Sequence, residues 1–381
     1  MRSTKLIGAL AGLALAGAAF TATPAVAQQA APPATCSLNS SPLRASAQPN
    51  AALNQRFTSY GNTSGRWVGA DSTYSIPLAG GGIAWLFSDT LYGTVRNNTL
   101  SPTQSFFLNN SVVLDKAGAM TTITHGTPTA PTSLVAPDAP NAWYWFGDGV
   151  QQPNKRVQIA ALRYTKFGTG AFDFGWDSTK VATFDPTTWA LLSLDPLPSQ
   201  AGIQWGSWWQ KGTGHTLVYG VEDRGAAKYM HLAKVLGSDM SNLSTWRFWN
   251  GRDWVKDEKA SVRLMAGVAN EYSVTPFEGG YLLITQDTTE AFSNKVVAYT
   301  SCSPTGPFTD KVELFRTPET GIWGSYGDPN VFTYNAHEHP ELRRGSTVVV
   351  SYNVNTFDTN AVYDDVTIYR PRFVDVTLTH D

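Results

Sequence analysis

Short runs of apolar residues, each ending near an acidic or amide residue, recur along the chain. Five runs can be marked by one residue each, namely Leu86, Trp145, Val218, Leu283 and Val349. The steps between these markers are 59, 73, 65 and 66 residues. Turn sequences flank the runs, so each run is expected to be one strand of a hairpin. Five units of similar length predict a five-bladed β-propeller, because a β-sandwich would explain the short strands but not the regular step.

Composition agrees with an all-β fold. The chain has 13 Trp, 15 Tyr and 18 Phe together with 33 Gly and 22 Pro. Aromatic residues favour strands, whereas Gly and Pro favour turns. No internal linker is visible, so residues 46–381 are predicted to form one propeller domain, preceded by a flexible extension at residues 28–45.

The N-terminus predicts export. Arg2 and Lys5 precede an apolar stretch at residues 6–20, and a tripeptide of small residues follows. This pattern is typical of a signal peptide, predicted here for residues 1–27 with cleavage after Ala27. The remaining chain has 26 basic and 30 acidic residues, a balance that favours neither nucleic acid nor a membrane as a partner. We expect a secreted, extracellular monomer.

The two cysteines are expected to form a disulfide. Cys36 lies in the N-terminal extension and Cys302 in a turn late in the chain. Bridged cysteines are usual in exported proteins. The alternative is that both remain unpaired, buried thiols.

Asp71 and Asp89 flank one predicted hairpin. Asp71 begins a strand that ends at Leu78, glycines follow, and residues 83–87 return to Asp89. If the turn centres on Gly80, positions i and 160 − i face each other, so that the two aspartates become cross-strand neighbours. Directly opposed residues have Cβ atoms about 5 Å apart.

Two carboxyl groups at this separation do not both ionise readily, so one keeps its proton while the other stays charged. Hydrolysis of a glycosidic bond needs such a division, with a protonated acid for the leaving oxygen and an ionised base or nucleophile. The alternative is that both aspartates bind backbone amides in turns, as Asp often does beside Ser, Thr or Gly.

Glu271 is a candidate for supporting the aspartate pair. It precedes residues 272–288, a segment similar to residues 74–90, and so occupies nearly the place of Asp71 in an equivalent unit. Equivalent strand starts converge on the centre of a propeller, which would bring Glu271 to the pair. The alternative is an exposed carboxylate at the start of a strand.

Asp148 and His337 are further candidates for substrate binding or support. Asp148 lies in a Gly-Asp-Gly sequence, which is also typical of a turn. His337 lies in a His-Glu-His sequence that offers two metal ligands without a third, so no metal site is predicted and the histidine is assigned to hydrogen bonds with substrate hydroxyls. No cofactor is expected, although the sequence allows a structural Ca²⁺ ion in the central channel.

Trp205, Trp208 and Trp209 form a cluster between two predicted blades. Their ring faces could stack on the C–H surfaces of sugars. Packing in the core between blades is the alternative for each of them.

Several sequence blocks resemble the signature of glycoside hydrolase family 183. They are Gly-Ala-Asp at residues 69–71, Ser-Ile-Pro-Leu at residues 75–78, Trp-Leu-Phe-Ser-Asp-Thr at residues 85–90, Val-Ser-Tyr-Asn-Val-Asn at residues 350–355 and Ile-Tyr-Arg-Pro-Arg-Phe at residues 368–373. The resemblance spans residues 55–378. One departure is Ser88, where many relatives have Gly.

This resemblance implies a secreted endo-D-arabinanase with a five-bladed propeller. Such enzymes cut the α-D-arabinofuranosyl backbone of mycobacterial arabinogalactan and lipoarabinomannan with inversion. The two catalytic aspartates of the family correspond to Asp71 and Asp89. D-Arabinan is therefore the polysaccharide that the resemblance implies as substrate.

Other functions stay open at this stage. A propeller that binds glycan without cleaving it, or one that cuts chain ends or another glycan, would have a similar sequence. The chain contains no Gly-x-Ser-x-Gly elbow, no phosphate-binding Gly-rich loop and no sialidase-type Asp box. These absences argue against esterases, nucleotide-binding enzymes and sialidases.

Overall fold

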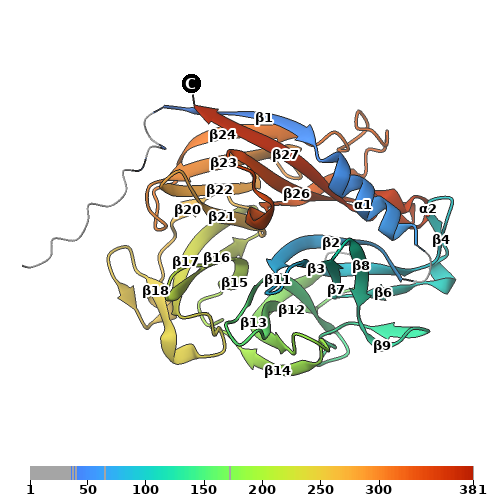
Figure 1. Ribbon diagram of the computed structural model, residues 1–381, viewed down its shortest axis with the longest axis horizontal. Coiled ribbons are helices and arrows are strands. Elements are labelled where there is room, and N and C mark those ends of the chain that lie inside the picture. The colour runs from blue at the N-terminus through green and yellow to red at the C-terminus, as the bar shows by residue number, and fades with distance from the viewer. Residues whose placement is uncertain (1–35, 37, 39–40, 64–65, 171–172, 381) are drawn as a thin grey trace, which may run out of the picture. The chain divides into compact units, whose positions relative to one another are not determined.

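The structure, a computed structural model, describes residues 36–380 except residues 37, 39–40, 64–65 and 171–172. The five larger antiparallel sheets of this part of the chain are the blades of a β-propeller (Figure 1). This confirms the predicted all-β, five-bladed fold. The predicted signal peptide and much of the predicted extension lie outside the described residues.

Blades 1 and 2 follow each other along the chain. From the inner to the outer strand, blade 1 comprises β2 (Arg66–Pro77), β3 (Ile83–Gly93), β7 (Ser111–Lys116) and β8 (Ala119–Ile123). Its connections contain β4 (Val95–Arg96), β5 (Thr99–Leu100), η1 (Pro102–Gln104), β6 (Phe106–Leu108), β9 (His125–Thr127) and β10 (Ala130–Thr132). Blade 2 comprises β11 (Ala142–Gln151), β12 (Val157–Lys166), β13 (Phe174–Phe184) and β14 (Leu191–Pro196).

Blades 3 and 4 repeat this meander. Blade 3 comprises β15 (Gln204–Lys211), β16 (His215–Arg224), β17 (Ala227–Leu236), β18 (Trp246–Trp249) and β19 (Trp254–Val255), with β20 (Met265–Ala266) pairing to β17. Two short helical turns, η2 (Leu243–Thr245) and η3 (Glu258–Ala260), lie in its outer connections. Blade 4 comprises β21 (Tyr272–Phe277), β22 (Gly280–Gln286), β23 (Lys295–Ser301) and β24 (Thr309–Arg316).

Blade 5 combines strands from both ends of the chain. It comprises β25 (Val331–Glu338), β26 (Thr347–Thr356), β27 (Pro371–His380) and, outermost, β1 (Leu43–Pro49). Its connections contain η4 (Pro340–Leu342), α2 (Ala361–Asp364) and η5 (Val366–Tyr369). All seven residues of β1 pair with β27, so the strand that starts the propeller completes its last blade.

The propeller therefore begins earlier than predicted. The expected flexible extension ran to residue 45, but β1 already starts at Leu43. Leu43 is buried in the core of blades 4 and 5, and this apolar contact holds the first residues of the strand in place.

The innermost strands hold the blades together at the centre. The inner strands of blades 1 to 5 contact one another in sequence, and β2 contacts β26 to complete the circle. Phenol groups join different blades. The hydroxyl of Tyr74 in blade 1 donates to the Ser207 carbonyl in blade 3, and that of Tyr272 in blade 4 donates to the Gly220 carbonyl in blade 3, each at 2.9 Å. Because buried polar groups are costly unless bonded, these contacts fix the positions of the inner strands.

One of the five sequence markers falls on a different strand from the others. Leu86, Val218, Leu283 and Val349 lie in the second strand of their blades, whereas Trp145 lies in the first strand of blade 2. The number of blades was predicted correctly, but the equivalence of the marked strands was wrong for blade 2. Its two inner strands are both strongly apolar, so the pattern alone did not separate them.

A helix that the sequence did not predict covers the junction of blades 5 and 1. This helix, α1 (Ala51–Gly61), starts at Asn50, whose side chain accepts a hydrogen bond from the Leu53 amide at 2.9 Å. Its buried Phe57 packs against Trp85 of blade 1 and Phe373 of blade 5. The helix thereby buries apolar surface of the first and last blades together.

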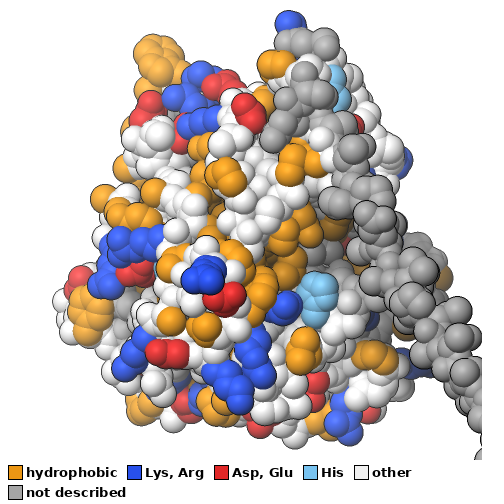
Figure 2. Space-filling model, turned by 90° about the vertical axis from the view of Figure 1, so that its left-hand side faces the viewer, with side chains coloured by type: hydrophobic (Ala, Val, Ile, Leu, Met, Phe, Trp, Pro, Cys, Tyr) orange, Lys and Arg blue, Asp and Glu red, His pale blue; other side chains and the backbone are white. Residues whose placement is uncertain are grey.

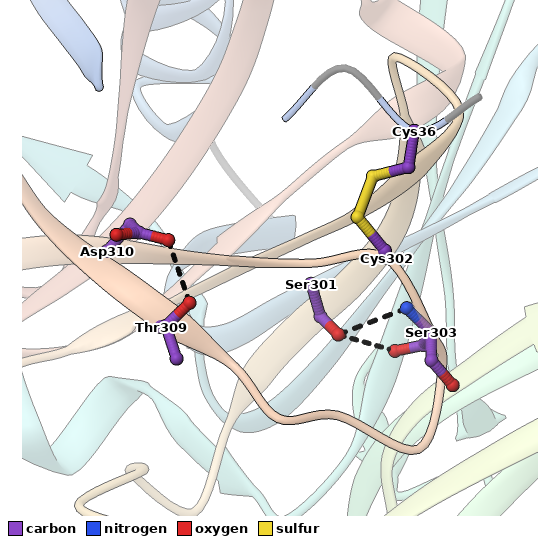
Figure 3. Close-up of a disulfide and its surroundings, with 6 residues drawn as sticks. All are labelled: Cys36, Ser301, Cys302, Ser303, Thr309 and Asp310. Atoms are coloured by element: carbon purple, nitrogen blue, oxygen red, sulfur yellow. Dashed lines mark hydrogen bonds between the residues drawn. A yellow bond between two sulfur atoms is a disulfide. The ribbon is translucent and has the colours of Figure 1, made fainter. Parts of the chain in front are cut away.

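The predicted disulfide is present. Cys36 and Cys302, separated by 266 positions, are joined by an S–S bond (Figure 3). Cys302 follows β23 directly, where the Ser301 hydroxyl donates to the Ser303 carbonyl at 2.8 Å. The bond fastens the start of the described chain to blade 4.

The surface shown in Figure 2 carries charges of both signs. On this side, which holds β18 in Figure 1, basic and acidic side chains lie among hydrophobic ones. Such mixing gives no extended field of one sign on this face. Among the described residues, no helix is long and apolar enough to cross a membrane.

Candidate functional site

A bulge in the first hairpin places the two candidate aspartates. The predicted pairing of positions i and 160 − i is found for Ala70 with Thr90 and again beyond the bulge for Tyr74 with Leu86. Asp71 and Asp89 lie between these pairs, where the register shifts, so neither has a direct cross-strand partner. The expectation of direct opposition was therefore wrong in detail, although both residues lie at the same point of the hairpin.

The backbone after Asp71 explains this difference. Ser72 and Thr73 have φ angles of 68° and 65°, in the left-handed region that β-branched residues seldom adopt. The extra residue of a bulge bends the strand and redirects the neighbouring side chain. Strained backbone of this kind is maintained when surrounding contacts fix it, and it is frequent at functional sites.

Asp71 accepts hydrogen bonds from two tyrosines of the last blade. The hydroxyl groups of Tyr334 and Tyr369 donate to its Oδ2 at 2.7 and 2.9 Å. Burial raises the pKa of Asp71 to about 6, while the two phenols and the nearby backbone amide of Asp89 oppose the increase. Oδ1 is buried and has no hydrogen-bond partner among the described residues.

Asp89 accepts hydrogen bonds from a residue of blade 2 and from a residue in a connection of blade 1. Its Oδ1 accepts from Trp145 Nε1 at 2.7 Å and from Asn109 Nδ2 at 3.0 Å. Burial and, secondly, the charge of Asp71 raise the pKa of Asp89 to about 8, against the effect of these two donors. At neutral pH this carboxyl group therefore holds a proton while that of Asp71 is largely ionised.

Glu271 joins the same site, as its place in the repeat predicted. The Ser72 hydroxyl lies 2.7 Å from Glu271 Oε1 and donates to it, so the glutamate contacts the bulge that follows Asp71. Burial raises the pKa of Glu271 well above its usual value, and the charge of Asp71 adds to the increase. Three carboxyl groups from two blades are thus gathered near the centre of the propeller.

His337 stabilises the bulge instead of facing a ligand. It is fully buried, and its Nε2 lies 3.3 Å from the carbonyl oxygen of Thr73. A carbonyl only accepts, so Nε2 carries the proton, and burial lowers the pKa of His337 to about 4, which keeps the ring neutral. Its Nδ1 is 3.9 Å from Glu271 Oε2. The predicted hydrogen bond to substrate hydroxyls is therefore not supported, and we describe His337 as a positioning residue.

Asn353 acts in the same way from β26. Its Nδ2 donates to the Thr73 hydroxyl at 2.9 Å and to the Ala70 carbonyl at 3.3 Å. These bonds are buried and bracket Asp71 in the chain. The orientation of Asp71 therefore depends on the last blade through Asn353 as well as through the tyrosines.

Asp148 lies in an equivalent bulge of blade 2 but does not join the carboxyl cluster. Its Oδ2 accepts from the Trp209 amide at 2.6 Å and its Oδ1 from the Gly149 amide at 2.7 Å. Burial raises the pKa of Asp148 to about 8. The residue thereby links blade 2 to blade 3. Its hydrogen bonds to backbone amides fit the turn-forming alternative and not the predicted role at the site.

The tryptophan cluster packs between blades. Trp205, Trp208 and Trp209 are only 0%, 5% and 4% exposed. The indole N–H of Trp205 donates to Glu258 at 2.9 Å, and that of Trp209 donates to the Trp205 carbonyl at 3.2 Å. No ring presents an open face for a sugar, so the core-packing alternative describes all three.

Other aromatic residues lie beside the two aspartates. On the Asp71 side, the ring of Tyr334 contacts Phe332, and Phe332 contacts Phe292 and Phe357, which are 50% and 44% exposed. On the Asp89 side, Trp145 contacts the following blade 2 residues: Trp143, Tyr164 and Phe174. Blades 5 and 2 flank blade 1, so aromatic surfaces border the carboxyl pair from both neighbouring blades.

No metal site is evident in the described part of the chain, where no group of three or more His, Cys, Asp or Glu side chains is arranged to hold an ion. The Ca²⁺ ion that the sequence allowed stays a prediction.

A comparison with protein families matches nearly the whole propeller domain to one family. The model of the family described as "Domain of unknown function (DUF5005)" matches residues 54–378. The chain belongs to this family. The match does not identify the glycoside hydrolase family that the sequence blocks resemble, so that finer assignment stays a prediction. No curated protein matches the sequence.

Solved structures resemble this DUF5005 domain at low sequence identity. A putative hydrolase from Bacteroides ovatus shares 19% identity over 87% of this chain and 90% of that chain, with a TM-score of 0.71, which shows a common fold. An α-L-arabinofuranosidase from Podospora anserina shares 11% identity over 82% of this chain and 91% of that chain, with a TM-score of 0.45. An exo-β-1,3-galactanase from Phanerochaete chrysosporium shares 10% identity over 81% and 60%, with a TM-score of 0.46. The last two scores are too low to support an inference.

Sequence reasoning missed the residues that hold the aspartates. Tyr334 lies far from the aspartates in the chain, and Asn109 lies in a connection without a recognisable pattern. Tyr369 and Asn353 were parts of family-like blocks, and Trp145 was used only as a marker of a strand. For these three residues a signal was present, but it did not indicate a role in the site.

Proposed function

We propose that this DUF5005 protein is a secreted glycoside hydrolase that cuts α-D-arabinofuranosyl linkages inside arabinan chains, with inversion of configuration. The observation that carries the proposal is the unlike environment of two neighbouring carboxyl groups. Asp71 receives two phenol donors, whereas Asp89 lies in the field of Asp71 and keeps its proton to higher pH. A proton donor and an ionised base side by side are the two groups that glycoside hydrolysis requires.

In the proposed reaction, Asp89 is the general acid and Asp71 the general base. Asp89 gives its proton to the glycosidic oxygen as the bond from that oxygen to the anomeric carbon breaks. Asp71 takes a proton from a water molecule, whose oxygen forms the new bond to the anomeric carbon from the opposite face. Oδ1 of Asp71 suits this step because it has no hydrogen-bond partner among the described residues. Both carboxyl groups exchange their protons with solvent before the next cycle.

Endo action and arabinan as substrate rest on two separate arguments. Aromatic surfaces from blades 5 and 2 border the carboxyl pair, so a chain could continue on both sides of the bond that is cut. The choice of D-arabinan rests on the sequence blocks that resemble glycoside hydrolase family 183.

The pKa values give this mechanism a specific pH dependence. The base must be ionised, so kcat/KM should rise with pH up to about 6, the pKa of Asp71. The acid must be protonated, so kcat/KM should fall above about 8, the pKa of Asp89. A bell-shaped profile with its maximum near neutral pH is expected.

Digestion of purified arabinogalactan tests the proposal. The wild-type protein should release oligosaccharides, which mass spectrometry can size, and internal cleavage should give products of several lengths. Asp71→Asn and Asp89→Asn should each lower kcat by about 100-fold or more, because each removes one proton-transfer group. Asp253→Asn, at an exposed position of blade 3, is the matched control and should retain full activity.

Three outcomes would contradict the proposal or a part of it. Binding of arabinan without any release of oligosaccharide would favour a glycan-binding propeller. Full activity of both aspartate variants would exclude the assigned acid and base. NMR of the first product reports its anomeric configuration, and retention would contradict inversion.

A further inference from the structure

An open cleft of about 560 Å³ is lined by Asn109, whose side chain donates a hydrogen bond to Asp89. It is bordered by Asn109 of blade 1, by Asn141 and Trp143 at the start of β11, and by Lys166 and Phe167 at the end of β12. The cleft is thus lined by residues of blade 1 and blade 2.

Two residues connect this cleft directly to the proposed acid. Asn109 lines the cleft and also donates to Asp89 Oδ1 at 3.0 Å. Trp143, a second lining residue, packs with its ring centre 5.7 Å from that of Trp145, which donates to the same carboxyl oxygen. Only one side chain therefore separates the cleft from the group that would protonate the leaving oxygen.

The chemistry of the cleft suits a sugar chain. Phe167 is 75% exposed, so its ring is open to a molecule that enters the cleft. Two amide side chains and the Lys166 ammonium group provide hydrogen-bond donors around the aromatic surfaces. Among the described lining residues none is acidic. A hydroxyl-rich ligand with apolar C–H faces fits such a mixture of aromatic rings and neutral polar groups.

From this geometry we infer that the cleft binds the sugar residues on the leaving-group side of the bond that is cut. The inference rests on the proposed function, because it takes Asp89 as the acid. The acid must lie beside the oxygen of the leaving sugar, so the part of the chain that departs extends from Asp89 into the cleft. Phe167 forms the outer wall that this part of the chain contacts.

The test compares two substrates that differ in their leaving group. One is an α-(1→5)-linked D-arabinofuranosyl hexasaccharide, whose leaving part is an oligosaccharide that fills the cleft. The other is the p-nitrophenyl glycoside of the corresponding trisaccharide, whose small phenol leaves without reaching Phe167. Phe167→Ala should lower kcat/KM for the hexasaccharide by about 3- to 10-fold, mainly through KM, and leave the aryl glycoside within about twofold of wild type.

Two further variants make the comparison specific. Phe167→Tyr keeps the aromatic ring and should restore cleavage of the hexasaccharide. Leu236→Ala removes an exposed apolar side chain at the end of β17 in blade 3 and should change neither rate.

The outcomes separate this inference from the proposed function. Equal losses on both substrates, or no loss on either, would overturn the assignment of the cleft while hydrolysis itself is still observed. A wild-type protein that cleaves neither substrate would overturn the proposed function together with the inference.

Discussion

Nε1 of Trp145 donates a hydrogen bond to Oδ1 of Asp89 at 2.7 Å, so a residue of blade 2 holds the proposed acid of blade 1. A donor to a carboxylate stabilises its ionised form and lowers its pKa. Trp145 therefore limits the increase that burial and the charge of Asp71 cause in Asp89.

Trp145→Phe should move the alkaline limb of the pH profile toward higher pH. Loss of the indole donor raises the pKa of Asp89 above about 8, by roughly one pH unit for a hydrogen bond to a charged group. Rates of arabinogalactan cleavage measured from about pH 5 to about pH 10 give the position of the limb. Trp254→Phe, the same change in an outer strand of blade 3, is the control. An unchanged limb in Trp145→Phe would mean that Asp89 does not set it.

Tyr334→Phe should move the acid limb of the pH profile toward higher pH as well. The Tyr334 hydroxyl stabilises the ionised form of Asp71, so its removal raises the pKa of Asp71 above about 6 and more alkaline conditions are needed to form the base. Tyr369→Phe should have a similar effect, since it removes the second donor. Tyr281→Phe, in blade 4, serves as a control with the same change of side chain. If both limbs shift equally, the two carboxyl groups titrate as one unit and the separate roles are not supported.

Asp148→Ala should reduce stability without reducing the activity of the folded protein. The substitution leaves the buried Trp209 amide and the Gly149 amide without acceptors, each costing about 1–3 kcal/mol in the free energy of unfolding. Urea unfolding followed by tryptophan fluorescence measures the loss. Asp148→Asn keeps one acceptor oxygen and should lose less. A folded Asp148→Ala protein with strongly reduced kcat would instead support a role for Asp148 in the active site.

Cys302→Ser should lower the free energy of unfolding through the unfolded state. The disulfide closes a sequence separation of 266 residues. The chain-entropy model gives about 5.6 kcal/mol for such a loop, and measured losses are commonly about 2–5 kcal/mol. Thermal unfolding of the oxidised wild type and of Cys302→Ser, each with and without reductant, measures the effect. Reductant should lower Tm only in the wild type, and equal Tm values in all four samples would contradict the expected contribution.

The sequence predicted features that depend on local pattern. Apolar runs with a regular step predicted five blades, and the pairing rule for the first hairpin was correct on both sides of the bulge. The repeat gave Glu271 nearly the place that Asp71 has in the first unit and so predicted that it lies near the aspartate pair. The hydrogen bond from Ser72 to Glu271 joins blades 1 and 4 beside Asp71. In these cases local sequence patterns were sufficient, because similar patterns recur from blade to blade.

Features that depend on distant contacts were not predictable in the same way. The bulge at Ser72 and Thr73 carries no Gly to indicate left-handed backbone, and it is fixed by His337 and Asn353 from blade 5. The Trp205 cluster illustrates the same limit, since aromatic residues in a core and in a binding site have the same sequence pattern. Tertiary contacts decide such cases.

The position of the two tyrosines late in the chain has a consequence for the order in which the site is completed. Tyr334 follows Asp71 by 263 residues and Tyr369 follows it by 298, so both aspartates leave the ribosome long before their partners. A chain that is still being synthesised, or one that a protease has shortened before β25, contains both acids but lacks the groups that distinguish the base from the acid. The arrangement on which the proposed hydrolysis depends is therefore complete only when translation has finished and the last blade has folded.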